Sequence, residues 1–85
     1  MKLALTVFLF GKLGDSMGRE LSFDGELVGR TIGALRLALA SQYPVASADL
    51  LSPRVRACVN DAIVDDGHLL CPGDEVSLLP PVSGG

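Results

Sequence analysis

The hydrophobic positions of the 85-residue chain follow a strand pattern near both ends and a helix pattern between them. Residues 2–10 are rich in β-formers and apolar on both faces of an extended chain, which is typical of a central, largely covered strand. Shorter apolar or alternating runs, bounded by turn residues, predict four further strands. These runs are residues 20–23, 54–59, 62–64 and 75–79.

One helix is predicted between residues 31 and 43, where apolar side chains recur every three or four positions. Thr31 is suited to cap its first turn, and Pro44 ends it because the residue before a proline avoids the α region. Residues 11–18, with three glycines, and residues 45–52, with no clear period, are expected to be loops. Either Leu50 or Leu51 should reach the core from the second loop.

The order strand, strand, helix, strand, short strand, strand predicts an α+β fold. In so short a chain, one amphipathic helix is buried most economically across one face of a mixed sheet. This arrangement is the β-grasp, or ubiquitin-like, architecture, with the first and last strands side by side. We expect residues 1–79 to form this domain and residues 80–85 to form a flexible C-terminal tail.

Charge and hydropathy limit the classes of partner and the cellular compartment that we expect for this chain. Seven Lys and Arg against ten Asp and Glu give a net charge of −3, so we expect no nucleic-acid partner. The apolar run at residues 3–10 is far shorter than the ~20 residues of a membrane span, and residues 11–15 lack a signal-peptide cleavage pattern. Cys58 and Cys71 form no Cys-x-x-Cys pair and are expected to be reduced and buried, which favours a cytoplasmic protein without a membrane partner.

No set of catalytic side chains can be assembled from the sequence. His68 is the sole histidine, and there is no nucleophile elbow or phosphate-binding loop. The acidic pairs at residues 65–66 and 74–75 are expected to be solvated turns rather than a metal site. We therefore expect no bound metal and no permanently bound cofactor.

The chain's chemistry is expected at its end, where Gly84 and Gly85 follow two prolines. Pro80 and Pro81 favour an extended segment that leaves the sheet, and the six tail residues can reach about 20 Å. Glycines can thread a narrow tunnel and present the carboxyl group of Gly85 to another protein's active site. A carboxylate is a poor electrophile, so this use requires activation by ATP as an acyl-adenylate. The alternative is a frayed terminus without a role.

The ending Leu79-Pro80-Pro81-Val82-Ser83-Gly84-Gly85 resembles the C-terminal signature of the molybdopterin synthase small subunits, the sulfur carriers of molybdenum cofactor biosynthesis. Residues 7–10, 59–60 and 73–76 support the resemblance, which covers nearly the whole chain. It implies that a ubiquitin-activating-like adenylyltransferase uses ATP to adenylylate Gly85. A sulfur donor, such as a cysteine desulfurase or a rhodanese-like protein, then converts Gly85 to a thiocarboxylate, the C-terminal 1-thioglycine.

The same resemblance implies a sulfurtransferase built from two large and two small subunits. The tail would enter the large subunit and deliver sulfur to cyclic pyranopterin monophosphate, and two deliveries would build the molybdopterin dithiolene. Gly84 and Gly85 are the residues expected to take part in the sulfur transfer. Partner contacts are expected from Phe8, Phe10, Leu78, Leu79, Pro80, Pro81, Val82 and Ser83, with core packing as the alternative for Leu78 and Leu79.

The chain departs from the family pattern at two places. Gly14-Asp15 stands where relatives often have Arg-Glu, so an inter-subunit ion pair from that arginine is not expected. Leu79 replaces a frequent aromatic residue and fills an apolar pocket with less area.

Other functions remain open. The chain could carry sulfur for thiamine synthesis or tRNA thiolation, although Pro-Pro-Val favours molybdopterin. It could be a protein modifier joined through Gly85 to target lysines, or a β-grasp interaction module with an idle tail.

Overall fold

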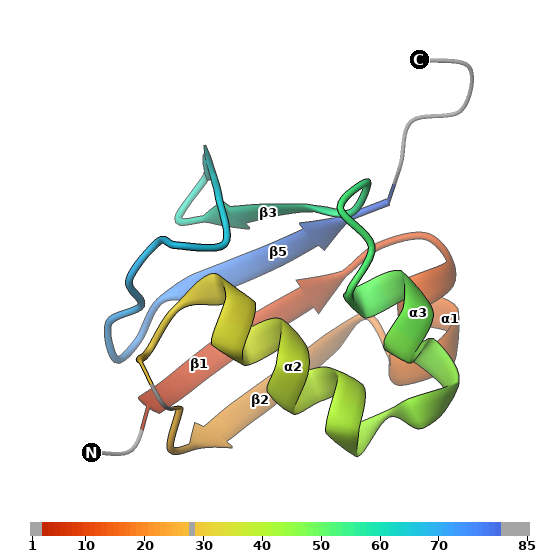
Figure 1. Ribbon diagram of the computed structural model, residues 1–85, viewed down its shortest axis with the longest axis horizontal. Coiled ribbons are helices and arrows are strands. Elements are labelled where there is room, and N and C mark those ends of the chain that lie inside the picture. Colours follow the sequence, from red (N-terminus) through yellow and green to blue (C-terminus); the bar gives the residue numbers. More distant parts are fainter. Residues whose placement is uncertain (1–2, 28, 81–85) are drawn as a thin grey trace.

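The computed structural model describes residues 3–27 and 29–80. It confirms the predicted fold: a five-stranded mixed sheet, in the order β2-β1-β5-β3-β4, packs against helices (Figure 1). The strands are β1 (Leu3–Leu9), β2 (Glu20–Gly25), β3 (Arg56–Val59), β4 (Ala62–Val64) and β5 (Glu75–Leu79). The helices are α1 (Lys12–Met17), α2 (Ile32–Gln42), the 3-10 turn η1 (Pro44–Ala46) and α3 (Ser47–Leu50).

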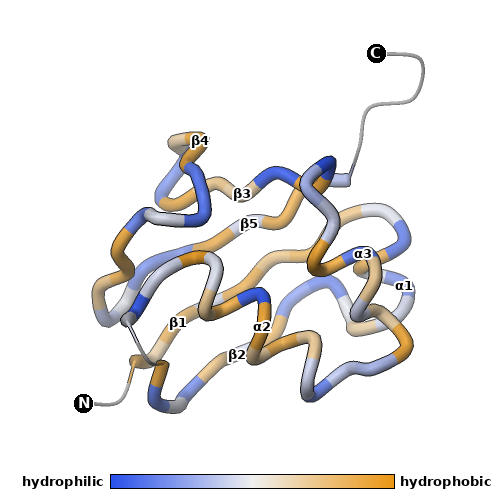
Figure 2. Tube along the Cα trace, in the orientation of Figure 1, coloured by the Kyte–Doolittle hydropathy of each residue, from blue (hydrophilic) through white to orange (hydrophobic). Residues whose placement is uncertain are grey.

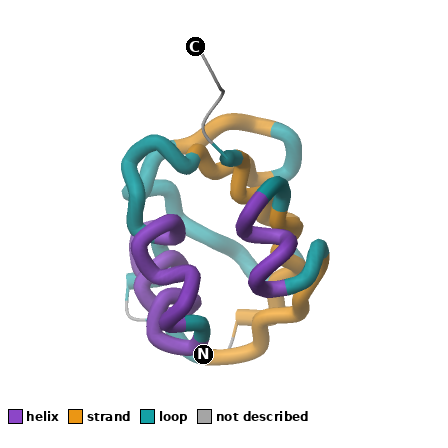
Figure 3. Tube along the Cα trace, turned by 90° about the vertical axis from the view of Figure 1, so that its right-hand side faces the viewer, coloured by secondary structure: helices purple, strands orange, loops and turns teal. Residues whose placement is uncertain are grey.

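The first and last strands lie side by side in the middle of the sheet, as predicted. β1 pairs with β5 in parallel and with β2 antiparallel, while β3 pairs antiparallel with both β5 and β4. Parallel pairing makes β1 and β5 run toward the same edge of the sheet, so the end of β5 lies beside the end of β1. In the side view of Figure 3, helices lie to the left of the strands, and one further helix overlaps the strands at the right.

The core lies between α2 and one face of the sheet. Leu3, Leu5, Val7 and Leu9 of β1 are buried on that face, and Figure 2 shows that β1 and much of α2 are hydrophobic. On the opposite face Ala4 is exposed and Thr6 only half-buried. The prediction that β1 is covered on both faces is therefore wrong, because the helices all serve a single face.

The helix α2 begins and ends close to where the sequence predicted. The Thr31 hydroxyl accepts a hydrogen bond from the amide of Ala34 at 3.1 Å, which satisfies one of the free amides of the first turn. Its buried apolar residues include Ile32, Leu35 and Leu39.

Both segments predicted as loops contain helices. Leu13 of α1 is buried, and Gly11 and Gly18, which have positive φ angles, bound the helix on either side, while Gly14 lies within it. In the second segment Leu50 is fully buried and Leu51 is 47% exposed, which settles which leucine reaches the core. Packing of one leucine in each segment stabilises helices too short to be recognised by periodicity.

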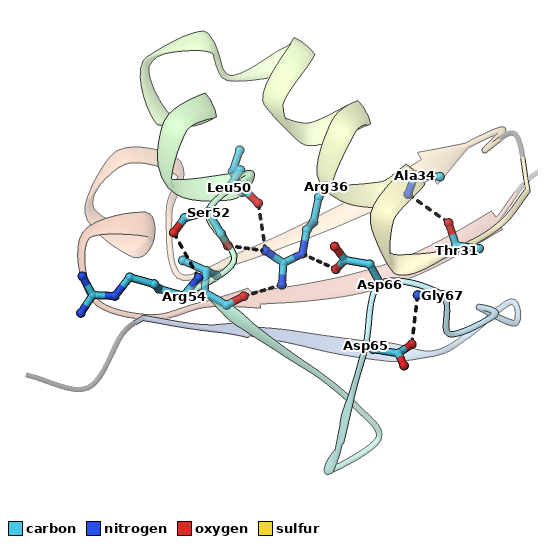
Figure 4. Close-up of polar contacts among 10 residues, drawn as sticks. Thr31, Ala34, Arg36, Leu50, Ser52, Arg54, Asp65, Asp66 and Gly67 are labelled. Atoms are coloured by element: carbon cyan, nitrogen blue, oxygen red, sulfur yellow. Dashed lines mark hydrogen bonds and ion pairs between the residues drawn. The ribbon is translucent and has the colours of Figure 1, made fainter. Parts of the chain in front are cut away.

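Arg36 of α2 is a charged residue that is buried. Only 6% of it is exposed, and its guanidinium ties α2 to the segment before β3 (Figure 4). Nη1 donates to the carbonyls of Leu50 at 3.2 Å and Ser52 at 3.0 Å, and Nη2 donates to that of Val55. Nε lies 3.0 Å from Oδ1 of Asp66, so this aspartate is not merely a solvated turn residue.

A second polar cluster joins the turn after β3 to the start of β5. The Asn60 side chain donates to Asp74 Oδ1 and accepts from the amide of Glu75, both at 3.0 Å. Asp74 Oδ2 in turn accepts from the amide of Cys71 at 2.8 Å. These contacts connect the turn after β3 to the start of β5.

Two further findings bear on the sequence predictions. Cys58 and Cys71 are both free thiols, but Cys71 is exposed and Cys58 half-buried, so the expected burial of both is wrong. Among residues 3–27 and 29–80, no helix has the length and hydrophobicity to span a membrane.

Candidate functional site

β5 carries the chain to the edge of the sheet from which the tail departs. Its residues alternate: Val76 and Leu78 are fully buried in the core, while Ser77 and Leu79 lie on the other face and are half-buried. For Leu78 the structure shows core packing, so its side chain offers no surface to a partner and that prediction is corrected. Leu79 does face outward and stands opposite Arg56 of β3.

Phe8, Phe10 and Leu79 form an apolar surface on the sheet face that no helix covers. Phe8 pairs with Ser77 across the β1–β5 ladder, so Phe10 comes level with the end of β5. Phe8 is half-buried and Phe10 is 47% exposed. We call these three residues the apolar surface; it borders the point where the tail begins.

Gly11 provides a seat for Pro80, the first residue of the tail. Gly11 has a φ angle of 62°, a conformation that L side chains rarely adopt. A Cβ atom at Gly11 would lie 3.1 Å from Cγ of Pro80, closer than an ordinary van der Waals contact. Glycine thus lets the turn after β1 lie directly against Pro80, which is half-buried there.

An open hollow of about 450 Å³ lies next to this seat. Its floor includes Gly14, where a Cβ atom would lie 2.8 Å from the carbonyl oxygen of Leu9. The departure from the family pattern at Gly14 therefore has a steric reason, because α1 here lies too close to β1 for a side chain. The hollow is lined by Phe8, Leu9, Phe10, Gly11, Gly14, Asp15, Arg19 and Glu20.

The structure brings together part of the predicted site. Phe8, Phe10, Leu79 and Pro80 meet at one edge of the sheet, but their contact with a partner stays a prediction. Pro81, Val82, Ser83, Gly84 and Gly85 lie outside the described residues. Within the described part of the chain, no group of three or more His, Cys, Asp or Glu is placed to hold a metal ion.

Sequence reasoning missed Gly11 and the two arginines near Leu79. A lone glycine directly after a strand is a signal for a left-handed turn, but it cannot reveal that Pro80, 69 positions later, packs on that turn. Arg54 and Arg56 flank the buried Val55, and this alternation was visible in the sequence; what it did not show is that Arg56 stands opposite Leu79.

Comparison with known proteins relates the chain to sulfur carriers and modifiers. The model of the ThiS family matches residues 7–85. The molybdopterin synthase sulfur carrier subunit of Escherichia coli (strain K12) is 40% identical over 55 residues, which cover 65% of this chain and 68% of that protein. The family match spans nearly the whole chain and includes the Pro80 to Gly85 tail.

Solved structures share the architecture. The crystal structure of SAMP1 from Haloferax volcanii is 27% identical with a TM-score of 0.79, covering 96% of this chain and 99% of that one. A putative molybdopterin converting factor, subunit 1, from Pyrococcus furiosus has a TM-score of 0.76 at 22% identity, covering 94% and 99%, and supports the fold alone.

Proposed function

The chain belongs to the ThiS family, and on this premise we propose that it is the sulfur-carrying small subunit of a molybdopterin synthase. It is a homologue of the Escherichia coli sulfur carrier subunit of that enzyme. The Pro80 to Gly85 ending supports molybdopterin over thiamine synthesis or tRNA thiolation.

In the proposed cycle the reactive group is the carboxyl group of Gly85. A ubiquitin-activating-like adenylyltransferase joins this carboxylate to the AMP moiety of ATP and releases pyrophosphate. A persulfide on a cysteine desulfurase or rhodanese-like donor attacks the acyl-adenylate and displaces AMP, which forms an acyl disulfide. A thiol then cleaves that S–S bond, leaving a thiocarboxylate on Gly85 and a disulfide between the thiol and the donor cysteine. In the active site of the large subunit that sulfur passes to cyclic pyranopterin monophosphate, and a second delivery completes the dithiolene.

The domain's own contribution is to position and hold the tail. The observation that carries the proposal is that β5 ends at Leu79 beside Phe10, on the uncovered face, with Pro80 seated on Gly11. A large subunit that buries the apolar surface would fix the base of the tail and so direct Gly84 and Gly85 into its active site. Two large and two small subunits would then form the working enzyme.

Deleting Gly85 tests this proposal. The variant should make no molybdopterin with the large subunit, an activating enzyme, ATP and a sulfur source, because the carboxyl group is then one residue short of the reacting position. It should still fold and dock, so an excess should inhibit the wild-type chain by competition. Normal molybdopterin formation by the deletion variant would contradict the mechanism.

A protein-modifier role is the second candidate, because the chain is similar to a small archaeal modifier protein, SAMP1, of Haloferax volcanii. In that role Gly85 would be joined to lysines of other proteins. Immunoblots of cells expressing a tagged chain distinguish the two: a modifier gives high-mass adducts that vanish when Gly85 is deleted. The sulfur-carrier proposal predicts no such ladder.

A further inference from the structure

Two unpaired arginines lie beside the apolar surface on its β3 side. Arg56 opens β3 and is the ladder partner of Leu79, so its exposed side chain stands on the same uncovered face. Arg54 is exposed in the turn two residues earlier. Among the described residues, neither guanidinium lies within ion-pair distance of a carboxylate, whereas that of Arg36 is fully engaged.

The charges of the protein are unevenly distributed along the strands. Because β1 and β5 run toward the tail and β2 and β3 run away from it, the opposite end holds the turns after β2 and β3 and the start of β5. That end is acidic in a chain with a net charge of −3. Its carboxylates are Asp24, Glu26, Asp61, Asp74 and Glu75.

On the tail side, the flanks of the apolar surface differ. Toward β2, Arg19 shares the hollow with Asp15 and Glu20, so positive and negative groups are mixed. Toward β3, Arg56 lines a second hollow with Asp65 and Asp66, of which Asp66 pairs with Arg36. With Arg54, this flank holds three arginines against two aspartates, whereas the β2 flank holds one arginine against two carboxylates. The uncompensated positive charge is therefore at the β3 flank.

We propose that Arg56, together with Arg54, docks against acidic side chains at the rim of the large-subunit active site that receives the tail. This inference rests on the proposed function. Any protein surface that buries Leu79 must also cover Arg56, since the two are cross-strand neighbours. Burying a guanidinium without an acceptor is costly, so that surface has to supply acceptors, and carboxylates are the acceptors that also neutralise its charge.

A small anion would not meet this requirement. It could neutralise the arginines, but it would leave Leu79 and Phe10 in water, and the apolar surface would gain nothing. An acidic rim on a partner protein neutralises the arginines and removes Leu79 and Phe10 from water at the same time. Its long-range attraction also orients the tail before short-range apolar contact forms, and the acidic opposite end of the domain is repelled by the same rim.

Association kinetics of the full chain with purified molybdopterin synthase large subunit test the proposal. The variant Arg56→Glu is compared with Arg30→Glu, a matched reversal in the loop before α2, at the acidic end, where the Arg30 carbonyl accepts from the amide of Leu70. Arg56→Lys keeps the charge, and Arg54→Glu tests the second arginine. Circular dichroism verifies that each variant is folded.

At about 50 mM salt we expect Arg56→Glu to lower the association rate about tenfold and Arg54→Glu about threefold, while Arg30→Glu and Arg56→Lys stay within about twofold of wild type. Near 500 mM salt, where charges are screened over a few ångströms, the loss for Arg56→Glu should shrink below about twofold.

The outcomes separate the two proposals. If the wild-type chain binds but Arg56→Glu behaves like Arg30→Glu, the docking role of the arginines is wrong and the proposed function stands. A loss for Arg56→Glu that does not diminish with salt also overturns it, because such a loss is not electrostatic. If the wild-type chain fails to bind the large subunit, the proposed function fails, and the inference that rests on it fails too.

Discussion

At the scale of single residues, Gly11 and Leu79 define where the domain ends and the tail begins. Gly11 has a φ angle of 62° and touches Pro80 where any other residue would place a Cβ atom. Leu79 is the last strand residue and faces outward between Phe10 and Arg56. Small changes at these positions are expected to alter how the tail is presented without altering the core.

Replacing Gly11 by Ala should lower the free energy of unfolding by roughly 1–2 kcal/mol, because alanine is strained at positive φ. It should also push Pro80 from its seat and slow sulfur transfer. Gly29→Ala is the matched control, since Gly29 has a φ angle of 82° but no atom within 4 Å of its Cβ position. Urea unfolding and single-turnover transfer assays are compared, and equal transfer rates in the two variants would show that the seat has no role.

Replacing Leu79 by Asp should raise the dissociation constant for the large subunit at least about tenfold, since a carboxylate at an apolar interface loses its hydration. Leu69→Asp places the same side chain at a leucine that is 59% exposed and outside the apolar surface. That control should bind normally. Calorimetric titration measures the dissociation constants of both variants. Wild-type affinity for Leu79→Asp would place the interface elsewhere.

At the scale of elements, Arg36 joins three parts of the chain: α2, the segment before β3 and the turn after β4. Its guanidinium connects α2 to the carbonyls of Leu50, Ser52 and Val55 and to Asp66 in the turn after β4. These carbonyls come just before β3, so the contact fixes how β3 approaches β5. The ion pair with Asp66 contributes less, because that carboxylate is 67% exposed.

Replacing Arg36 by Met keeps an unbranched apolar stem but removes the guanidinium, which leaves three carbonyls without their donor. We expect a loss of about 3 kcal/mol in the free energy of unfolding. Asp66→Asn should cost less than about 1 kcal/mol, since the exposed partner is easily replaced by water. Urea denaturation of both variants tests this order, and similar losses would show that the ion pair, not the carbonyl contacts, stabilises the segment.

The sequence predicted the strands and the α2 cap well, because these depend on local periodicity and on side chains a few residues apart. Thr31 and Pro44 mark the ends of α2 through contacts within one turn. The short helices escaped prediction because Leu13 and Leu50 stabilise them through contacts with distant residues. Arg36 and Gly11 escaped for the same reason, since their partners lie up to 69 positions away.

At the scale of the whole molecule, the protein is a sheet with one face devoted to stability and the other available for partners. The helices, the buried leucines and Arg36 all serve the covered face. The open face holds the apolar surface and Arg56 at the edge where β5 delivers the tail, and the opposite end is acidic. A domain built this way contributes recognition, while the chemistry we propose belongs to the carboxyl group of Gly85.

The most direct test of this central claim is the intact mass of the protein after incubation with ATP, an activating enzyme and a sulfur source. A sulfur carrier should gain the mass that replaces one terminal oxygen by sulfur, and this gain should be absent without ATP and absent when Gly85 is deleted. If the mass stays unchanged while the same enzymes convert another carrier, the chain is not a sulfur carrier.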